Sequence, residues 1–480
     1  MSPHLLLDTL RATLGADHVL TAAGDVAGYA EDWRKRYRGT PLAVVLPGST
    51  DEVAAVVRLC HAARVAIVPQ GGNTGLAGGA TPDGSGVQLV LSLRRMRRIR
   101  DIDTADRVLV AEAGCVLAEV QHAARTAGLL FPLSLAAEGS ATIGGVLSTN
   151  AGGTAVLRYG NARALCLGLE AVTAQGAVWH GLSSLRKDNT GYDLRDLLIG
   201  SEGTLGIITA ASLALHPQPV ARRTAWTALA DPAQAVALLA QARDALDAGL
   251  TGFELMGRAC IELVARHFPA LRAPLPADSA PWFVLLELSD SESEAHAQER
   301  LETVLGQALQ VGTVRDCAVA TSLAQATAMW RIREHIPLAQ AAEGLNIKHD
   351  IAVPVSRMAG FVADTAARLE RMIPEARLIV FGHLGDGNLH YNVQAPAGVD
   401  AEAFRARHES ACNALLHEAA VAAGGSFSAE HGIGMLKTGE LAKFKDPVAL
   451  AMMRALKQAL DPDDLLNPGK VLPQDQAAHM

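Results

Sequence analysis

Apolar residues in the first half of the chain form short runs rich in Val, Leu and Ile, which alternate with segments whose apolar positions recur at helical spacing. Short runs of this kind are typical of strands that are buried on both faces. We predict strands at 42–47, 65–70, 87–93 and 107–114, with the segments 166–179 and 203–219 completing an α+β module. Helices are predicted at 51–64, behind the potential N-cap residues Ser49 and Thr50, and at 116–128, which ends at a glycine.

Pro217 and Pro219 interrupt this pattern and mark a boundary, beyond which longer helical segments separate fewer strands. Strands are predicted at 282–288 and 350–355, and helices at 291–309, 321–335, from 356 onward and at 447–460. Residues 376–394 predict two strands joined by a Gly-Asp-Gly turn, because a tight hairpin turn favours residues that tolerate positive φ. The second module is therefore expected to be an antiparallel sheet covered by helices.

The composition restricts the classes of protein that remain. A chain of 480 residues, 49% hydrophobic and 19% charged, predicts a folded globular protein of two or three domains. Its net charge of −8 argues against a nucleic-acid partner. The six cysteines form no Cys-x-x-Cys pair, so an iron–sulfur site, a zinc ribbon and a disulfide framework are not expected. Without a long apolar span or a signal-peptide pattern, the predicted location is the cytoplasm, with peripheral membrane attachment as the alternative.

Three glycine-rich loops occur in the first module: VPQGGNTGLAGG at 68–79, EGSATIGGVLSTNAGGTAVLRYG at 138–160 and GSEGTLGIIT at 200–209. Glycines let a backbone approach a ligand closely, and successive N–H groups can bind a pyrophosphate. Neither a Rossmann-type nor a Walker-type glycine pattern accompanies them. Each loop alone could be a surface turn, but three of them in one module indicate an extended dinucleotide cofactor.

Candidate metal ligands occur in GHLGDGNLHYN at 382–392 and SAEHGIG at 428–434. His383 and His390 flank the predicted hairpin turn, so their imidazoles can converge at one end of the sheet, and Glu430 adds a carboxylate. Such a set is typical of a divalent metal with room for substrate. The alternative is two unrelated histidines and a surface Glu-His pair.

Isolated basic residues are weaker candidates. Arg333 and Lys348 could each bind a carboxylate, although single residues of this kind more often lie on a solvated surface. The basic run at 94–100 is interpreted as a hydrated edge, partly compensated by the acidic residues that follow.

Six ordered motifs lie between about Tyr37 and Leu472: PQGGNTGLAGG, GSATIGGVLSTNAGG, SLRKDNTGYDLRDLLIGSEGTLGIIT, GHLGDGNLH, SAEHGIGMLK and LDPDDLLNPGKVLP. Together they resemble the FAD-linked oxidases of the vanillyl-alcohol oxidase superfamily, in particular the D-2-hydroxyglutarate and D-lactate dehydrogenases and the glycolate oxidase catalytic subunit. The resemblance implies an α+β fold, with a p-cresol-methylhydroxylase-type (PCMH-type) FAD-binding domain of two α+β subdomains and a C-terminal antiparallel-sheet substrate domain covered by helices. The implied parts are an N-terminal helical segment at 1–36, the FAD domain at 37–218, the substrate domain with the metal site at 219–440, and a helix and tail at 441–480 that return to the FAD domain.

The resemblance also implies the residues that contact FAD. They are Pro69, Gly71, Gly72, Asn73, Thr74 and Gly75 at the pyrophosphate, Ser140, Thr142, Gly145, Asn150, Gly152 and Gly153 along the flavin and ribityl chain, and Glu202, Ile208 and Asn467 further along. Some relatives attach flavin to a histidine of the first loop. No histidine lies between Pro69 and Gly86, so noncovalent FAD is expected.

For the second module, the resemblance implies a divalent metal, expected to be zinc, and a substrate site. The implied roles are metal binding by His383, His390 and Glu430, proton acceptance by His431, and substrate binding by Arg333, Lys348 and Asn392. Pro337 replaces a threonine of the 2-hydroxyglutarate enzymes and cannot donate the same hydrogen bond.

The expected activity is the FAD-dependent oxidation of a D-2-hydroxy acid, with D-2-hydroxyglutarate favoured because the retained Arg and Lys suit a dicarboxylate. The implied mechanism combines metal-assisted deprotonation of the alcohol with hydride transfer to flavin N5. The alternatives are a D-lactate or glycolate dehydrogenase, a transferase similar to alkyl-dihydroxyacetone-phosphate synthase, and a noncatalytic flavin-binding subunit. The expected partners are an electron-transfer flavoprotein or a quinone as electron acceptor, and a second copy of the chain in a homodimer.

Overall fold

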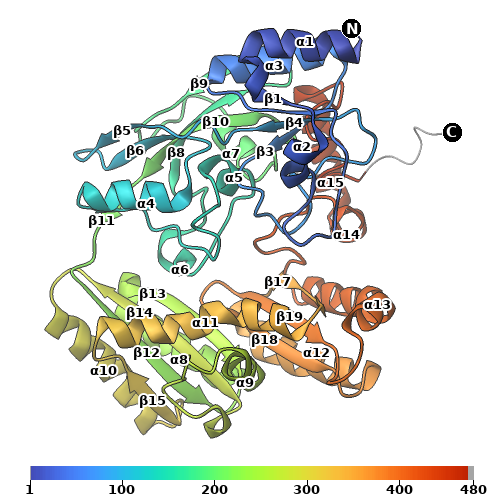
Figure 1. The fold of residues 1–480 in the computed structure, drawn as a ribbon. Coiled ribbons are helices and arrows are strands. Elements are labelled where there is room, and N and C mark those ends of the chain that lie inside the picture. The colour runs from blue at the N-terminus through green and yellow to red at the C-terminus, as the bar shows by residue number, and fades with distance from the viewer. Residues whose placement is uncertain (1, 474–480) are drawn as a thin grey trace. The chain divides into compact units, whose positions relative to one another are not determined.

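The computed structural model describes residues 2–473 (Figure 1). The chain divides into two compact units. Unit 1 comprises Met1–Gly152, Gly160–Gln218 and Glu430–Met480, and unit 2 comprises Gly153–Tyr159 and Pro219–Ala429. Within the described residues, no helix is both long and apolar enough to cross a membrane.

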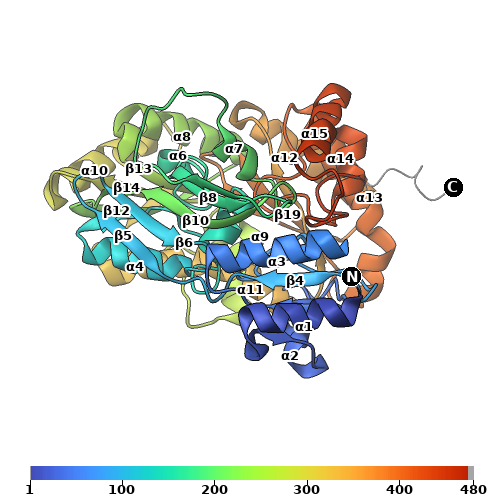
Figure 2. The same cartoon turned by 90° about the horizontal axis from the view of Figure 1, so that it is seen from above.

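The first sheet of unit 1 has the strand order β1-β2-β4-β3, in which β2, β4 and β3 run parallel. Its strands are β1 (Val19–Leu20), β2 (Ala43–Val45), β3 (Ile67–Gln70) and β4 (Leu89–Ser92). The helices beside it are α1 (Pro3–Leu14), α2 (Ala23–Ala30) and α3 (Thr50–Ala63). Helices α1 and α3 lie side by side (Figure 2) and bury leucines and valines in one core with this sheet. The N-cap of α3 is Ser49, one of the two candidates, and its hydroxyl accepts the N–H of Glu52.

The second sheet of unit 1 is antiparallel and has the strand order β5-β6-β10-β8-β9. Its strands are β5 (Ile99–Asp103), β6 (Val108–Glu112), β8 (Cys166–Val172), β9 (Val178–Gly181) and β10 (Ile207–Ala214). Smaller elements of the unit are α4 (Leu117–Thr126), β7 (Leu129–Leu130), α5 (Ile143–Ser148), α7 (Leu194–Leu198) and β11 (His216–Pro217). Together, the two sheets confirm the α+β organisation predicted for the first module.

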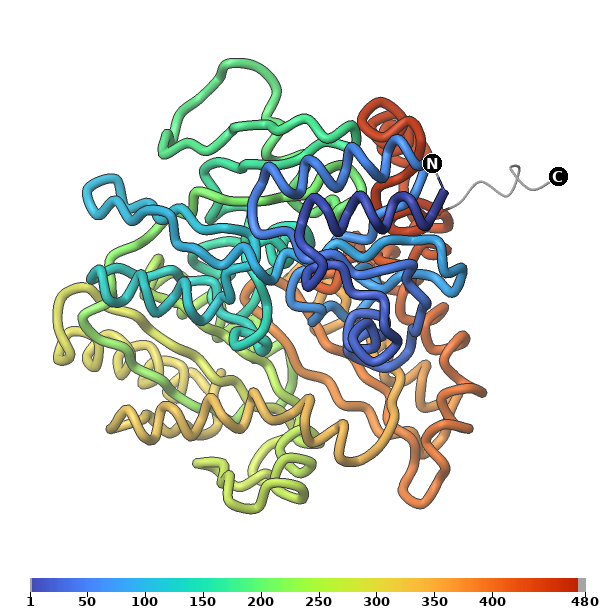
Figure 3. Tube along the Cα trace, turned by 45° about the horizontal axis from the view of Figure 1, so that its top comes forward, coloured from blue at the N-terminus to red at the C-terminus, as the bar shows by residue number. Residues whose placement is uncertain are grey.

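The C-terminal part of the described chain belongs to unit 1 and runs through α14 (Thr438–Phe444) and α15 (Pro447–Leu460). It then returns to the first sheet, where the N–H of Asn467 donates to the carbonyl of Ile67 at 2.7 Å (Figure 3). Leu466 is fully buried in the core shared with α1 and α3. This return places Asn467 beside Ile67, the first residue of β3, and the Asn467 side chain reaches the carbonyl of Gly79 in the first glycine-rich loop.

Unit 2 is built on one antiparallel sheet of eight strands with the order β15-β12-β14-β13-β18-β19-β16, and β17 also pairs with β19. Its strands are β12 (Ala221–Leu229), β13 (Leu250–Gly257), β14 (Trp282–Asp290), β15 (Asp316–Val319), β16 (Asn346–Ile347), β17 (Asp350–Ala352), β18 (Arg377–His383) and β19 (Asn388–Gln394). Its helices are α6 (Val156–Tyr159), α8 (Pro232–Leu246), α9 (Arg258–His267), α10 (Glu294–Gln310), α11 (Leu323–Glu343), α12 (Met358–Met372) and α13 (Ala401–Ala422). The predicted antiparallel sheet covered by helices is confirmed, as is the hairpin β18–β19.

Helix α11 is longer than the sequence predicts. The helix predicted at 321–335 continues through Pro337 to Glu343, although residues before a proline are biased away from helical φ and ψ. Ile336 and Ala339 are fully buried in a core with β13, β14 and β18, and this tertiary packing outweighs the cost of the proline.

The end of α11 supplies a titratable contact between helices and the sheet. Glu343 pairs with Arg266 at 2.9 Å, with His267 at 2.5 Å and with Arg377 of β18 at 2.5 Å. The hydrogen bond from His267 and the charge of Arg377 lower the pKa of the Glu343 carboxyl to about 2. A carboxyl whose pKa is lower in the folded state stabilises the fold above its unfolded pKa, and this contribution is lost as the pH falls toward the folded value.

Glu343→Gln is therefore expected to lower the free energy of unfolding by about 1–2 kcal/mol at pH 7, since exposed or partly exposed ion pairs contribute up to about 1 kcal/mol each. The difference from wild type should shrink as the pH falls from about 4.5 toward 2. Thermal unfolding followed by circular dichroism at pH 7 and pH 3 measures it. An equal difference in melting temperature at both pH values would contradict this assignment.

Candidate active site

The first glycine-rich loop of unit 1 starts directly after β3 and packs against the second loop. A Cβ on Gly72 would lie 2.0 Å from the carbonyl oxygen of Ser140, and one on Gly71 would lie 2.4 Å from Oγ1 of Thr142. Only glycine permits this approach of two backbones. The amide of Gln70 supports the loop from inside by donating to the carbonyls of Tyr29 and Ala80, both at 2.9 Å.

A cavity of about 300 Å³ opens where these loops meet. It is lined by Gly71, Gly72, Asn73, Ser140 and Thr142, all expected to contact FAD, and by Gly28, Tyr29, Gln70, Ser92, Arg94, Arg97, Gly114 and Val116. The hydroxyls of Ser92 and Thr142 are buried, and within the described chain neither has a hydrogen-bond partner. Unpaired buried hydroxyls on a cavity wall fit a polar ligand that supplies the missing partners. The residues present therefore fit the phosphate and sugar groups of FAD.

Arg94 and Arg97 line this cavity, a place that the sequence analysis did not assign to them; both are exposed, as expected for a hydrated edge, and Arg97 pairs with Glu119. The parallel pairing of β3 with β4 sets Gln70 opposite Ser92, so the loops that follow both strands emerge at the same edge of the sheet. Guanidinium groups beside a glycine loop suit a pyrophosphate. The position of the two arginines on the cavity follows from the register of β3 and β4, and the pattern of charges in the sequence does not reveal this register.

Other residues expected to contact FAD lie nearby or elsewhere in unit 1, except Gly153, which begins the short N-terminal part of unit 2. Pro69 lies in β3, Thr74 and Gly75 continue the first loop, and Gly145 lies in α5. Asn150 lines a different cavity, of about 400 Å³, with Asn161 and Arg163, and Gly152 and Gly153 follow it in the chain. Ile208 is buried in β10.

Asn467 and Glu202 form a hydrogen-bonded link near the first loop. The Asn467 amide donates to the carbonyls of Gly79 and Glu202, both at 2.8 Å, and its Oδ1 is buried without a partner in the described chain. The Glu202 carboxylate accepts the N–H groups of Ile433 and Gly434 at 2.7 and 2.8 Å. Burial raises the pKa of Glu202, and these two N–H groups oppose the rise.

The Glu202 contacts fix the loop that follows Glu430 and His431. The N–H of Met435 in this loop also donates to the carbonyl of Ala77 at 2.9 Å, so the loop lies against the first glycine-rich loop. Glu202 therefore positions the segment after His431, a role that the sequence analysis did not assign to it.

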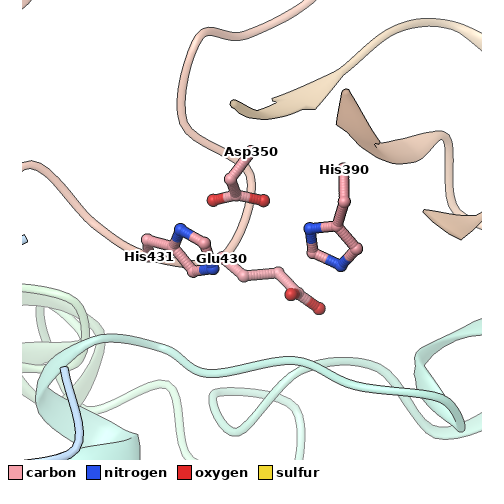
Figure 4. A group of neighbouring side chains, drawn as sticks. All are labelled: Asp350, His390, Glu430 and His431. Carbon is pink, nitrogen blue, oxygen red and sulfur yellow. The ribbon is translucent and has the colours of Figure 1, made fainter. Parts of the chain in front are cut away.

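Four potential metal ligands, Asp350, His390, Glu430 and His431, converge (Figure 4). Each offers a ligand atom, and these atoms lie within 4.8 Å of one another. Asp350 of β17 is the register partner of His390 of β19, so both side chains leave the same face of the sheet. The N–H of Ala429 donates to the carbonyl of Asp350 at 3.3 Å, so Glu430 and His431 follow directly from a residue held by that strand. Two imidazoles and two carboxylates are a donor set that fits a divalent cation.

Asp350 was not identified from the sequence, and His383, which was, is not in this group of four. The His383 ring centroid nevertheless lies 5.8 Å from that of His390. Nδ1 of His383 lies 2.6 Å from Oε1 of Glu254, whose side chain is fully buried. An ionised carboxylate only accepts hydrogen bonds, so Nδ1 of His383 donates to Glu254.

Of the residues expected to bind substrate, Arg333 lies in α11, where its Nε donates to Oε2 of Glu254 at 2.7 Å and its guanidinium stacks over Phe381 with the carbon 4.8 Å from the ring centroid. Burial would raise the pKa of Glu254, but His383 and Arg333 outweigh it and lower this pKa to about 2. Asn392 is buried, accepts the N–H of His349 and donates to Gln340 at 3.0 Å.

Lys348 is half-buried between β16 and β17, two residues before Asp350. Pro337 lies four residues after Arg333 in α11, and positions at this spacing share a face of the helix. Pro337, for which the family resemblance implies a threonine, therefore follows Arg333 on that face by one turn.

The sheets, the glycine loops and the convergent donor set define a flavin-dependent oxidoreductase, and the chain belongs to the FAD-linked oxidase family. Residues 218–471 match the C-terminal domain of FAD linked oxidases, and residues 41–181 match a FAD binding domain. These matches confirm the family expected from the motifs and FAD as the cofactor.

The relatives include D-2-hydroxyglutarate dehydrogenases. The chain is 40% identical over 442 residues to the mitochondrial enzyme of Arabidopsis thaliana, covering 92% of this chain and 77% of the relative. It is 41% identical over 443 residues to the mitochondrial enzyme of Bos taurus, covering 92% and 79%. It is 40% identical over 465 residues to the enzyme of Xanthomonas citri pv. viticola, covering 96% of each chain.

Solved structures with the same fold are more distant in sequence. p-Cresol methylhydroxylase with substrate bound has a TM-score of 0.77 at 16% identity, covering 98% of both chains. Alkyldihydroxyacetonephosphate synthase has a TM-score of 0.72 at 17% identity, covering 98% of this chain and 85% of the other. At these identities the likeness shows the fold alone, and it confirms the PCMH-type fold expected for the FAD domain.

Proposed function

We propose that the protein oxidises D-2-hydroxyglutarate to 2-oxoglutarate, using FAD and a divalent metal ion. The observation that carries the proposal is the convergence of Asp350, His390, Glu430 and His431 within 4.8 Å, on a chain whose relatives carry the name of this activity. Arg333 and Lys348 supply two cations for a substrate with two carboxylates. A dicarboxylate therefore suits the site better than a monoacid.

In this proposal, the chain's residues bind the substrate and move its proton. Arg333 and Lys348 hold the carboxylates and orient the carbon that loses hydrogen. His431 accepts the hydroxyl proton, since a neutral imidazole is suited to base catalysis near neutral pH. His383, His390 and Glu430 are the proposed metal ligands, with Asp350 as a further donor beside them. The metal, when bound, lowers the pKa of the substrate hydroxyl, and FAD, when bound, is the hydride acceptor.

The proposal is tested by titrating the purified yellow protein anaerobically with 2-hydroxy acids while flavin absorbance is recorded. D-2-hydroxyglutarate is expected to reduce the flavin with a kcat/KM about 10- to 100-fold above that of D-lactate, because the monoacid leaves one cation without its charge-assisted hydrogen bond. Glycolate and L-2-hydroxyglutarate serve as comparison substrates. Faster reduction by D-lactate or glycolate would overturn the choice of a diacid, and the absence of reduction by any hydroxy acid would overturn the dehydrogenase itself.

Zinc is the proposed metal, because imidazole and carboxylate donors are a common zinc set. Elemental analysis of the purified protein, before and after dialysis against a chelator, checks its identity. The proposed acceptor of the electrons is a separate electron-transfer flavoprotein or a quinone. Cytoplasmic location and a homodimer stay predictions from the sequence.

A further inference from the structure

Glu254 is a carboxylate in the interior of the unit 2 sheet. It lies within β13, where its register partners are His383 on β18 and Leu285 on β14, and its side chain is fully buried. Removing a carboxylate from water costs several kcal/mol, and well-packed apolar residues in such a place are often at least as stable as a buried ion pair. Stability alone therefore does not explain an ionised glutamate at this position.

The two oxygens of Glu254 serve two different residues of the candidate site. Oε1 lies 2.6 Å from Nδ1 of His383, and Oε2 accepts Nε of Arg333 at 2.7 Å. Within residues 2–473, Glu254 is the only acidic residue in ion-pair distance of Arg333. One carboxylate thus holds two residues: His383 of the neighbouring strand, a proposed metal ligand, and Arg333 of helix α11, which is proposed to bind the substrate.

Each contact restricts the geometry of its partner. The Nδ1 contact fixes the ring orientation of His383 and directs its Nε2 away from Glu254, the arrangement that carboxylate-bound histidines adopt at metal centres. The Nε contact and the stacking over Phe381 fix the guanidinium plane of Arg333, a planar group that can bind a carboxylate through its other nitrogens.

We propose that Glu254 is a positioning residue that orients His383 toward the metal and Arg333 toward the substrate carboxylate, so that metal affinity and substrate affinity depend on the same buried side chain. The inference rests on the proposed function for the identity of the substrate. Its metal part rests on the proposed role of His383 as a metal ligand and on the geometry of Glu254 and His383.

Glu254→Gln is the direct test, because glutamine has almost the same shape but its amide cannot accept hydrogen bonds from two donors on opposite oxygens. If the glutamine oxygen accepts the hydrogen bond from Nε of Arg333, the glutamine NH₂ faces Nδ1 of His383 and favours the histidine tautomer in which Nε2 carries the proton. If the glutamine oxygen instead faces His383, the glutamine NH₂ faces Nε of Arg333, and two donors meet. Zinc affinity, measured by chelator competition without substrate, is expected to fall about 10- to 100-fold. The KM for D-2-hydroxyglutarate at saturating zinc is expected to rise about tenfold or more, with a smaller change in kcat.

Glu343→Gln is the matched control, because it also removes a carboxylate that joins α11 to β18, through Arg377, without touching His383 or Arg333. Its zinc affinity and KM should equal those of wild type. If Glu254→Gln does not fold, Glu254→Asp keeps the charge but is one methylene too short for both contacts, and at least one of the two readouts should shift about tenfold.

Zinc affinity and KM within twofold of wild type in the folded Glu254 variant would overturn the inference. The two proposals fail separately. A wild-type protein whose flavin is not reduced by D-2-hydroxyglutarate refutes the proposed substrate, while a lowered zinc affinity of Glu254→Gln still supports the positioning of His383.

Discussion

Replacement of His431 by alanine is expected to slow the reduction of the flavin by D-2-hydroxyglutarate by about 100- to 10,000-fold, the usual contribution of a positioned general base. His431 presents a ring nitrogen within 4.8 Å of the ligand atoms of Asp350, His390 and Glu430. Alanine removes the proton acceptor and adds no bulk. The rate is measured by anaerobic stopped-flow recording of flavin absorbance at saturating substrate and zinc.

The zinc content of the His431→Ala variant distinguishes the two roles that His431 can have at this position, general base and metal ligand. If it is the base, the variant keeps as much zinc as wild type and stays slow when more zinc is added. If it is chiefly a metal ligand, the variant loses zinc, and added zinc restores much of the rate. His122→Ala is the control, since His122 is exposed on α4 in unit 1. Flavin reduction at the wild-type rate in His431→Ala would remove His431 from the mechanism.

The elements of the site that sequence could predict are those made by local pattern. The hairpin β18–β19 follows from alternating apolar residues around a Gly-Asp-Gly turn, and Gly387 indeed has a φ of +84°. The antiparallel register then pairs Phe381 with His390, and the rings of His383 and His390 lie 5.8 Å apart. The sequence around the turn is therefore enough to predict that His383 and His390 lie close together.

The missed residues depend on contacts between segments far apart in the sequence. Asp350 joins the donor set because β17 pairs with β19, and Glu254 meets His383 because β13 pairs with β18. Register between distant strands is determined by packing of the whole sheet, and a single sequence does not display it. The same cause explains Arg94 and Arg97, whose place on the first cavity depends on the pairing of β3 with β4.

Several roles taken from the family resemblance remain predictions at the level of individual residues. Asn392 is engaged by His349 and Gln340, so substrate binding would need its amide to exchange partners or use its remaining hydrogen-bonding capacity. Glu202 holds the backbone of the loop after His431. These hydrogen bonds support a role for Glu202 in positioning the loop. The sequence motif alone does not distinguish this role from direct contact with the cofactor.

Gly72→Ala is expected to yield protein with little bound FAD. The added Cβ would lie 2.0 Å from the carbonyl oxygen of Ser140 and 3.2 Å from Cα of Ala141, and backbone atoms cannot move aside as the end of a flexible side chain can. The two loops must separate, which costs about 1–3 kcal/mol as overpacking does elsewhere and deforms the cavity that both loops line. The ratio of flavin to protein after purification, and the dissociation constant for added FAD, measure the effect, which we expect to be at least tenfold in affinity.

Gly84→Ala is the control for this prediction. A Cβ on Gly84 would meet no atom within 4 Å, and the residue is exposed outside the cavity, so the variant should keep its flavin and its melting temperature. Zinc affinity provides a second reference, because two of the proposed ligands, His383 and His390, lie in unit 2, whereas Gly72 and the third ligand, Glu430, lie in unit 1. Gly72→Ala protein that binds zinc normally but lacks flavin would show that the defect is confined to the glycine loops. Full occupancy by FAD would contradict the placement of the cofactor against Gly72.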